Sequence, residues 1–327
     1  MKKIKAGVYL IMAFLLAGMT GCKMTDKNIR FGAAGVGGSY YTFATAYTQL
    51  VSQEDDKIQF DVKTTAGSMA NLRLLSEGYI DIAIAQADLV NENYYESEET
   101  PEYKVLAGLY TEACHIVVRK DSDIFSLEDL QGKRISIGEK ESGTEQNALQ
   151  ILQVCGLVDS IVDTVNLDYI EAAKQLEDGE IDAMFCTAGI EANVIADVSK
   201  SCEIRLLDID DKTIQKLQLA YPFYEAYEIP KDSYVGQDKK VQTVGIKALL
   251  LAGNDVSNQT AKRLTELLFS NATRIKYATA IEDIYDEQEA VNGITIPFHE
   301  GALEYYEEQG VRIEGNENKE IKNGNTN

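Results

Sequence analysis

Short apolar segments alternate with amphipathic segments from residue 28 onward, and this alternation predicts an α/β fold. Residues 29–32 (IRFG) read as a short strand, residues 58–62 (IQFDV) alternate like a half-buried strand, and residues 80–85 (IDIAIA) are almost continuously apolar, as in a strand covered on both faces. Two helical stripes lie between these strands, formed by Phe43, Tyr47, Leu50 and Val51 and by Met69, Leu72 and Leu75.

The same order of elements returns about a hundred residues later. Residues 134–138, 162–169 and 181–185 read as strands, with a helix carrying Ala148, Leu149 and Leu152 and another starting at Glu171. The segments LLSEGYIDIAIAQAD and QLEDGEIDAMFCTAG can be superposed, since Leu176 follows Leu75 by 101 positions and Gly179 follows Gly78 by the same interval. Two βαβαβ units predict two three-layer α/β lobes, each with its own parallel sheet.

Two long extended stretches mark the places where the chain crosses between the copies. Residues 107–122 (AGLYTEACHIVVRKDS) and 241–255 (VQTVGIKALLLAGND) are predicted to be paired hinge strands. They divide the chain into a first lobe of residues 29–112 and 245–314 and a second lobe of residues 113–244. A helix with Ala261, Leu264, Leu267 and Leu268 is expected to return to the first lobe.

The N-terminal end of the chain predicts an export signal, and the C-terminal end predicts a disordered tail. Residues 1–21 join a basic start to a short apolar stretch, which predicts a signal peptide. They end in MTGC, which resembles the bacterial lipobox and predicts an acylated Cys22 that anchors a linker of residues 22–28; Met19 replaces the usual leucine, so ordinary cleavage stays an alternative. Residues 315–327 are polar and predicted to be disordered.

Charge and cysteine content narrow the possible partners. The net charge is -22, which makes nucleic acid a poor partner and requires any anionic ligand to be held by local dipoles and donors. The remaining cysteines show no zinc-like spacing, and the sequence leaves their disulfide state open. These cysteines are Cys114, Cys155, Cys186 and Cys202.

Loops that follow the strands are expected to form a ligand site, because ligands of open α/β sheets bind outside the carboxyl ends of the strands. The first copy contributes residues 35–41, 65–68 and 86–88, and the second contributes residues 139–144 and 187–189. Glycine-rich turns that open helices expose backbone N–H groups, so the site favours a carboxylate or a phosphate. Ser39 and Thr144 can cap their helices or donate to the ligand, and Gln86 is expected to face Thr187 across the gap.

Other functions find little support in the sequence. A dinucleotide loop would need glycine where Tyr40 stands, and the HExxH and GxSxG motifs are absent. His115 is expected in the core and His299 at the start of the last helix, while Cys186 has no evident histidine partner. The sequence therefore indicates no catalytic residue, no metal site and no cofactor.

Several further side chains are candidates for the site. Glu139 and Glu141 are interpreted as exposed loop charges, and Arg73 as the partner of a nearby acid. Four tyrosines can either line the ligand site or pack against other residues of the protein. They are Tyr40, Tyr41, Tyr221 and Tyr224.

Five segments together resemble the TAXI family, the extracytoplasmic solute receptors of TRAP transporters: GAAGVGGSYY, TTAGSMANLRLLSEGYIDIAIAQAD, SLEDLQGKRISIGEKESGTEQNA, AYPFYEAYEIPKDSYVGQDKKVQTVGIKALLL and ITIPFHEGALEYY. The resemblance implies a type II periplasmic-binding-protein-like architecture with the ligand in the interlobe cleft. It implies a non-enzymatic receptor, held by its N-terminal lipid at the outer face of the bacterial cell membrane or free in the periplasm.

The same resemblance implies a small anionic solute, an organic acid or a glutamate-like amino acid, that is passed to a TRAP membrane permease subunit. An exported sensor that signals to a membrane partner without transport is the alternative. The segment EKESGTE and the residues Cys186 and Thr187 depart from the usual family pattern. The residues expected to bind the ligand, Thr187 among them as the predicted counterpart of Gln86, are Gly37, Ser39, Tyr40, Ser68, Gln86, Ser142, Gly143, Thr144 and Thr187.

Overall fold

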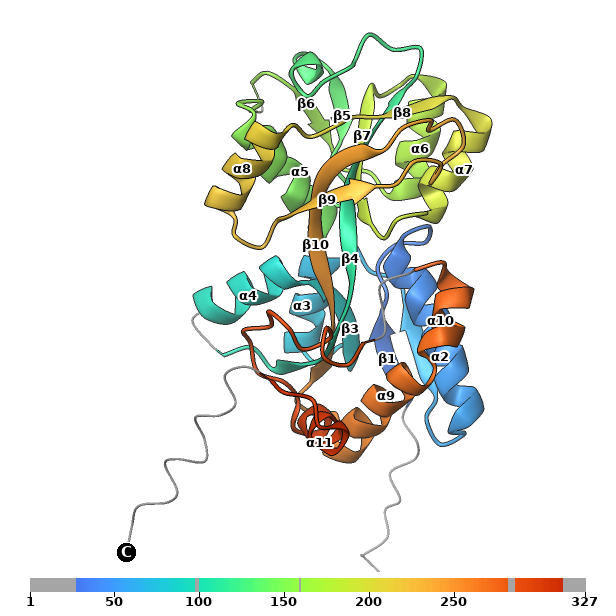
Figure 1. Ribbon diagram of the computed structural model, residues 1–327, viewed down its shortest axis with the longest axis vertical. Coiled ribbons are helices and arrows are strands. Elements are labelled where there is room, and N and C mark those ends of the chain that lie inside the picture. The colour runs from blue at the N-terminus through green and yellow to red at the C-terminus, as the bar shows by residue number, and fades with distance from the viewer. Residues whose placement is uncertain (1–27, 98–99, 159, 282–285, 314–327) are drawn as a thin grey trace, which may run out of the picture.

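The computed structural model describes residues 28–97, 100–158, 160–281 and 286–313 (Figure 1). The predicted signal peptide, Cys22 and nearly all of the polar tail lie outside the described residues. Within these ranges, no helix has both the length and the apolar character needed to cross a membrane.

Two lobes are joined by a pair of long antiparallel strands, β4 (Tyr103–Arg119) and β10 (Val241–Gly253), which run from one lobe into the other (Figure 1). Their pairing extends from Gly253 opposite Tyr103 to Gly245 opposite Ala113, with irregularities in the register between. The predicted two-lobed α/β fold with paired crossing strands is thus confirmed.

The first lobe contains a parallel set of strands in the order β2 (Phe60–Lys63), β1 (Ile29–Gly32) and β3 (Ile82–Gln86). Phe31 illustrates the register of these strands, because it pairs with Val62 of β2 on one side and with Ile82 of β3 on the other. The helices of this lobe are α2 (Ser39–Glu54), α3 (Ser68–Ser76), α4 (Ala87–Glu96), α9 (Asn258–Ser270), α10 (Ala272–Thr279) and α11 (Glu300–Gln309).

The second lobe repeats this order with β6 (Asp163–Val165), β5 (Arg134–Ser136) and β7 (Ala183–Ala188). Strands β8 (Ile204–Leu206) and β9 (Glu225–Ile229) pair with β4 and β10. The remaining elements are the 3-10 turn Glu128–Leu130 and the helices α5 (Gly143–Val154), α6 (Tyr169–Asp178), α7 (Asn193–Ser201) and α8 (Asp211–Ala220).

The expectation of a separate parallel sheet in each lobe is wrong. Strand β10 pairs antiparallel with β3, and β4 pairs antiparallel with both β10 and β7, so one mixed sheet runs through both lobes. The crossing strands are long enough to act as sheet members in both lobes. Their backbone groups are therefore hydrogen-bonded along most of their length, as buried backbone requires.

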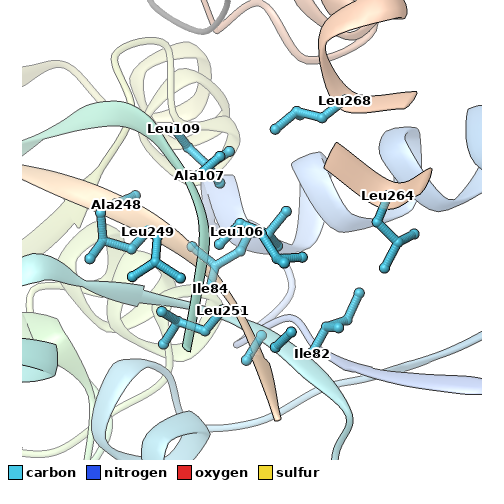
Figure 2. Packing of buried hydrophobic residues seen from close by; sticks show 14 of the residues in the cluster. Ile82, Ile84, Leu106, Ala107, Leu109, Ala248, Leu249, Leu251, Leu264 and Leu268 are labelled. Carbon is cyan, nitrogen blue, oxygen red and sulfur yellow. The ribbon is translucent and has the colours of Figure 1, made fainter. Parts of the chain in front are cut away.

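The core of the first lobe surrounds the crossing strands (Figure 2). Leu264 and Leu268 of α9 pack in the same cluster as Ile82 and Ile84 of β3, as expected for a helix that returns to this lobe. The hydroxyl of Tyr47 also donates a hydrogen bond of 2.7 Å to the carbonyl of Leu264, which ties α2 to α9.

Two residues of the predicted helical stripes do not face the core. Met69 is 39% exposed and Leu149 is 37% exposed, whereas Leu72, Leu75 and Leu152 are buried. Met69 lies in the first turn of α3, where the helix opens toward the cleft, and so it falls outside the face that packs on the sheet. His115 and His299 follow the predictions, because His115 is buried and His299 is the N-cap of α11.

Candidate functional site

Three helices begin at the junction of the lobes, each after the carboxyl end of a strand. Helices α2 and α3 come from the first lobe and α5 from the second. The N-caps of α2 and α3 are Gly38 and Gly67, and neither provides a side-chain hydrogen bond; at α5, Ser142 accepts one of 2.9 Å from the N–H of Glu145. The first N–H groups of a helix lack intrahelical acceptors and carry partial positive charge, so this junction favours an anion.

These helix starts line an enclosed cleft with a cavity of about 40 Å³. All but one of the predicted ligand-binding residues line it. They are Ser39, Tyr40, Ser68, Gln86, Ser142, Gly143, Thr144 and Thr187. A cavity of this size suits a small solute around which the lobes close.

Gly37 is the predicted residue that the structure does not bring to this cleft. It lines a separate groove between α2, α6 and α7, and its carbonyl accepts a hydrogen bond of 3.3 Å from the N–H of Val194. Its φ of +93° is readily available to glycine, so a role in the turn accounts for it.

A buried glutamate, Glu112, lines the cleft together with its hydrogen-bond partners. The hydroxyl of Tyr40 donates a hydrogen bond of 2.6 Å to Oε2 of Glu112 and lies 3.3 Å from Oγ of Ser68. Ser68 in turn accepts a hydrogen bond of 3.2 Å from the N–H of Gln86. Burial raises the pKa of Glu112 to about 8, although hydrogen bonds from the side chains of Tyr40 and Gln86 act to lower it.

Glu112 did not emerge from the sequence analysis. It lies on β4, in a crossing strand read as extended and apolar. One feature of the sequence could have indicated Glu112, because it is an acidic residue within the mostly apolar segment LYTEACHIVV. A charged residue in a buried strand requires partners or a function.

A chain of amide and hydroxyl groups links the two lobes behind the cleft. Nε2 of Gln86 donates to Oδ1 of Asn147 at 2.9 Å, and Nδ2 of Asn147 donates to the hydroxyl of Tyr224 at 2.9 Å. The hydroxyl of Tyr224 donates to Oε1 of Gln150 at 2.6 Å. Gln86 and Thr187 both line the cleft as expected, but the partner that Gln86 finds across it is Asn147.

Hydrogen bonds of Thr144 position the residues of the second lobe that line the cleft. The hydroxyl of Thr144 lies 2.6 Å from that of Tyr169 and accepts a hydrogen bond of 3.1 Å from the N–H of Thr187. The hydroxyl of Tyr169 donates to the carbonyl of Thr187 at 3.0 Å. Thr144 therefore positions the strand end that carries Thr187, and Tyr169 is a lining residue that the sequence analysis missed.

Three of the tyrosines considered for the cleft wall lie elsewhere. Tyr41 lines the groove that contains Gly37, while Tyr221 and Tyr224 pack edge to face beside the second-lobe core. Among the four, only Tyr40 lines the cavity.

Direct contacts across the cleft show that the lobes are closed on each other. Arg73 pairs with Glu141 at 2.9 Å, and the carbonyl of Glu141 accepts a hydrogen bond of 3.1 Å from the N–H of Ala70. On the opposite lip, Oγ of Ser39 accepts a hydrogen bond of 2.9 Å from the N–H of Gly189. The interpretation of Arg73 as the partner of an acid is confirmed.

Glu139 differs from the expected exposed loop charge, because it is half-buried and lines the cleft. Its pKa is raised by burial and by the nearby Asp168. Among the described residues that line the cavity, none is lysine, arginine or histidine. The positive potential here comes from the helix starts, while the charged side chains are acidic.

The buried histidine and the cysteines offer no second reactive centre in the described part of the chain. His115 is held by the carbonyl of Cys186 at 3.0 Å and the hydroxyl of Tyr234 at 2.9 Å, and burial lowers its pKa to about 4. Burial also raises the pKa of the Cys114 thiol to about 12. No group of three or more His, Cys, Asp or Glu residues within the described ranges is placed to hold a metal ion.

Comparisons with known proteins agree with this architecture. The sequence matches the NMT1-like family over residues 31–310. The structure is similar to that of the periplasmic binding protein BugD, with a TM-score of 0.54 and 10% identity over 77% of this chain and 85% of that one. It is also similar to a putative L-cystine ABC transporter from Listeria monocytogenes, with a TM-score of 0.50 and 15% identity over 80% of this chain and 99% of that one.

An ancestral arginine-binding protein bound to arginine gives a TM-score of 0.50 and 15% identity, over 76% of this chain and 96% of that one. At such identities the likeness establishes the fold. Binding and transport proteins stand among the similar structures.

Proposed function

Because the chain belongs to the NMT1-like family and has the fold of periplasmic binding proteins, we propose that it is an extracytoplasmic receptor for a small solute. The lobes close on a solute that carries a carboxylate, such as an acidic amino acid or an organic acid. The receptor then passes the solute to a TRAP-type secondary transporter, as the resemblance of its sequence segments to TAXI receptors implies.

One observation carries the proposal: helix starts from both lobes converge on one enclosed cavity. The glycine N-caps of α2 and α3 leave backbone N–H groups without a side-chain acceptor beside that cavity. A carboxylate placed there accepts hydrogen bonds from both helix starts and meets their partial positive charge. Because α5 reaches the same cavity from the second lobe, binding favours closure of the lobes.

A thermal-shift screen tests the receptor function directly. The purified chain is heated with amino acids, monocarboxylates and dicarboxylates in turn, and the midpoint of unfolding is compared with that in buffer. A ligand that binds only the folded state at 100 times its Kd adds about 2.7 kcal/mol to the free energy of unfolding. We expect a clear rise for at least one carboxylate; no rise with any small solute would contradict the proposal.

The membrane arrangement and the transport partner need separate experiments. We propose that Cys22 carries the lipid, which metabolic labelling with a fatty-acid analogue tests against Cys22→Ala. Uptake of the identified solute by cells or proteoliposomes that contain a TRAP permease tests delivery. Labelling that persists in Cys22→Ala would contradict the anchor, and uptake that does not depend on the receptor would contradict the transport role.

A further inference from the structure

A buried carboxyl group lines the cleft, and no described residue that lines it carries a cationic side chain to match. Glu112 is 2% exposed and lines the cavity at the floor, where the crossing strand β4 passes between the lobes. Among the described residues lining the cavity, the other ionisable acid is Glu139, and none is cationic. Arg73 is engaged outside the cavity with Glu141. An ionised carboxylate in such a place is costly unless a partner of opposite charge reaches it.

A second acceptor lies beside the same cavity. Gln86 is 2% exposed, and its Oε1 has no hydrogen-bond partner among the described residues. In this arrangement its Nε2 donates to Asn147, Asn147 donates to Tyr224 and Tyr224 donates to Gln150, so Oε1 is the atom of the Gln86 amide that is left without a partner. The floor of the cleft thus presents acceptor oxygens, whereas the helix starts present donors.

We propose that Glu112 is the specificity-determining residue of the cleft and binds an ammonium group of the solute, while the helix starts hold its carboxylate. The ligand is then an amino acid, and acids of the same skeleton that lack the ammonium group are poor ligands. This inference rests on the receptor function proposed above and narrows it from carboxylates in general to zwitterions. A charge-assisted hydrogen bond in a dry site supplies the discrimination.

The groups that face Glu112 make its ionisation sensitive to such a ligand. Asp88 on α4 is the charged neighbour, and Tyr40, Tyr169, Cys114 and Cys186 surround the carboxyl group with side chains that are neutral near pH 7. Burial raises the pKa of Glu112 to about 8 and that of Asp88 to about 7. An ammonium group lowers the pKa of Glu112, so the bound complex has lost a proton that the free protein held at pH 7. A second carboxylate of a dicarboxylate ligand would instead keep Glu112 protonated.

Matched pairs of ligands test this inference. L-Glutamate is compared with glutarate, L-alanine with propionate, and L-leucine with 4-methylpentanoate, so that each pair differs only in the ammonium group. Titration calorimetry on the full chain at pH 7, in buffers of different ionisation enthalpy, gives the affinity and the protons exchanged. We expect the amino acid of the best pair to bind at least about 10-fold more tightly than its partner and to release protons.

Glu112→Gln keeps the shape of the side chain and an acceptor for Tyr40 while removing the charge. It should weaken amino acid binding about 10-fold or more and bring the ratio within each pair close to one. Glu92→Gln on the exposed face of α4 removes a charge from the same lobe and should preserve the wild-type ratio.

The outcomes separate this inference from the receptor function. Equal or tighter binding of the deaminated acids, proton uptake on binding, or an unchanged ratio in a folded Glu112→Gln variant would overturn the ammonium assignment and leave the receptor proposal standing. The ligand pairs and the proton measurement need only the wild-type protein, so the test does not depend on the folding of the variant. Failure of every solute to bind would overturn the receptor proposal and this inference together.

Discussion

The side chain of Gln86 in the first lobe donates a hydrogen bond of 2.9 Å to Oδ1 of Asn147 in the second. This contact joins the lobes behind the cavity, and Asn147 also donates to Tyr224 within the second lobe. Both amides are buried, so each group that loses its partner pays the cost of desolvation. The contact therefore stabilises the closed arrangement of the lobes.

Substitution of Asn147 should weaken both closure and stability. Asn147→Ala leaves Nε2 of Gln86 and the hydroxyl of Tyr224 without this partner, and we expect the free energy of unfolding to fall by about 1–3 kcal/mol. Affinity for the ligand should fall about 10-fold, as measured by titration calorimetry. Tyr224→Phe is the matched control, because it removes hydrogen bonds of the second lobe only. The affinity of Tyr224→Phe for the ligand should stay within about 3-fold of wild type. Equal losses of affinity in both variants would contradict the role of the contact between Gln86 and Asn147 in closure.

Much of the fold could be predicted because the sequence repeats its pattern. The interval of 101 positions between Leu75 and Leu176 identifies two copies of one unit, and the two parallel strand sets follow the same order. The extended apolar stretches identified the crossing strands. Strand β9 escaped prediction because its residues are mostly exposed and charged, so that no apolar alternation marks it. The continuity of the sheet escaped because strand pairing between distant segments leaves no local signal.

The parts of the site that consist of backbone groups could be predicted. Glycine-rich turns such as that around Gly38 are readable as helix starts, and their place follows from the topology. The sequence could not place Glu112 and Tyr169 at the cavity, because their positions depend on the tertiary arrangement of strand β4 and helix α6. The same reason explains why Gly37 and Tyr41, close in sequence to Tyr40, line another groove.

Addition of one methyl group at Gly143 should prevent closure without unfolding the second lobe. A Cβ at this position would overlap Oε1 and lie 2.5 Å from Cδ of Gln86, whose amide is held by Asn147. Alanine suits a helix better than glycine, so Gly143→Ala should keep the free energy of unfolding within about 1 kcal/mol of wild type. Affinity should fall at least about 10-fold, since closure and binding are linked.

Leu149→Ala on the exposed side of α5 is the control for that helix and should bind as wild type. Titration calorimetry gives the affinities, and small-angle X-ray scattering with ligand should show a larger radius of gyration for Gly143→Ala. Wild-type affinity in Gly143→Ala would contradict the closed arrangement of Gln86 against α5.

The ion pair between Arg73 and Glu141 should act as a weak latch on one lip of the cleft. Both side chains are about half exposed, so solvent screens much of their attraction. Arg73→Gln should raise the dissociation rate of the ligand about 2-fold to 5-fold, as measured by stopped-flow fluorescence, with a smaller effect at 0.5 M salt. Lys240→Gln removes an exposed pair with Glu228 inside the second lobe and should leave the rate unchanged. A rate that does not respond to Arg73→Gln would show that the latch does not contribute.

Stability without ligand should fall as the pH rises through the titration of Glu112. Burial raises the pKa of this carboxyl group from 4.5 to about 8, so the folded state binds its proton more tightly than the unfolded state does. The associated stability is fully present below pH 4.5 and is lost progressively as the pH approaches 8, by up to about 5 kcal/mol. Asp88, with a pKa raised to about 7, adds a loss of the same sign above pH 3.8.

Comparison with Glu112→Gln isolates the contribution of Glu112, because both proteins keep Asp88. Urea denaturation at pH 5, 6.5 and 8 should give a free energy of unfolding that falls less steeply with pH in the variant, and the two curves should draw apart toward pH 8. Glu96→Gln, altered at the exposed end of α4, should follow the wild-type curve. Parallel curves for wild type and Glu112→Gln would mean that the carboxyl group titrates alike in the folded and unfolded states, which its burial against Tyr40 argues against.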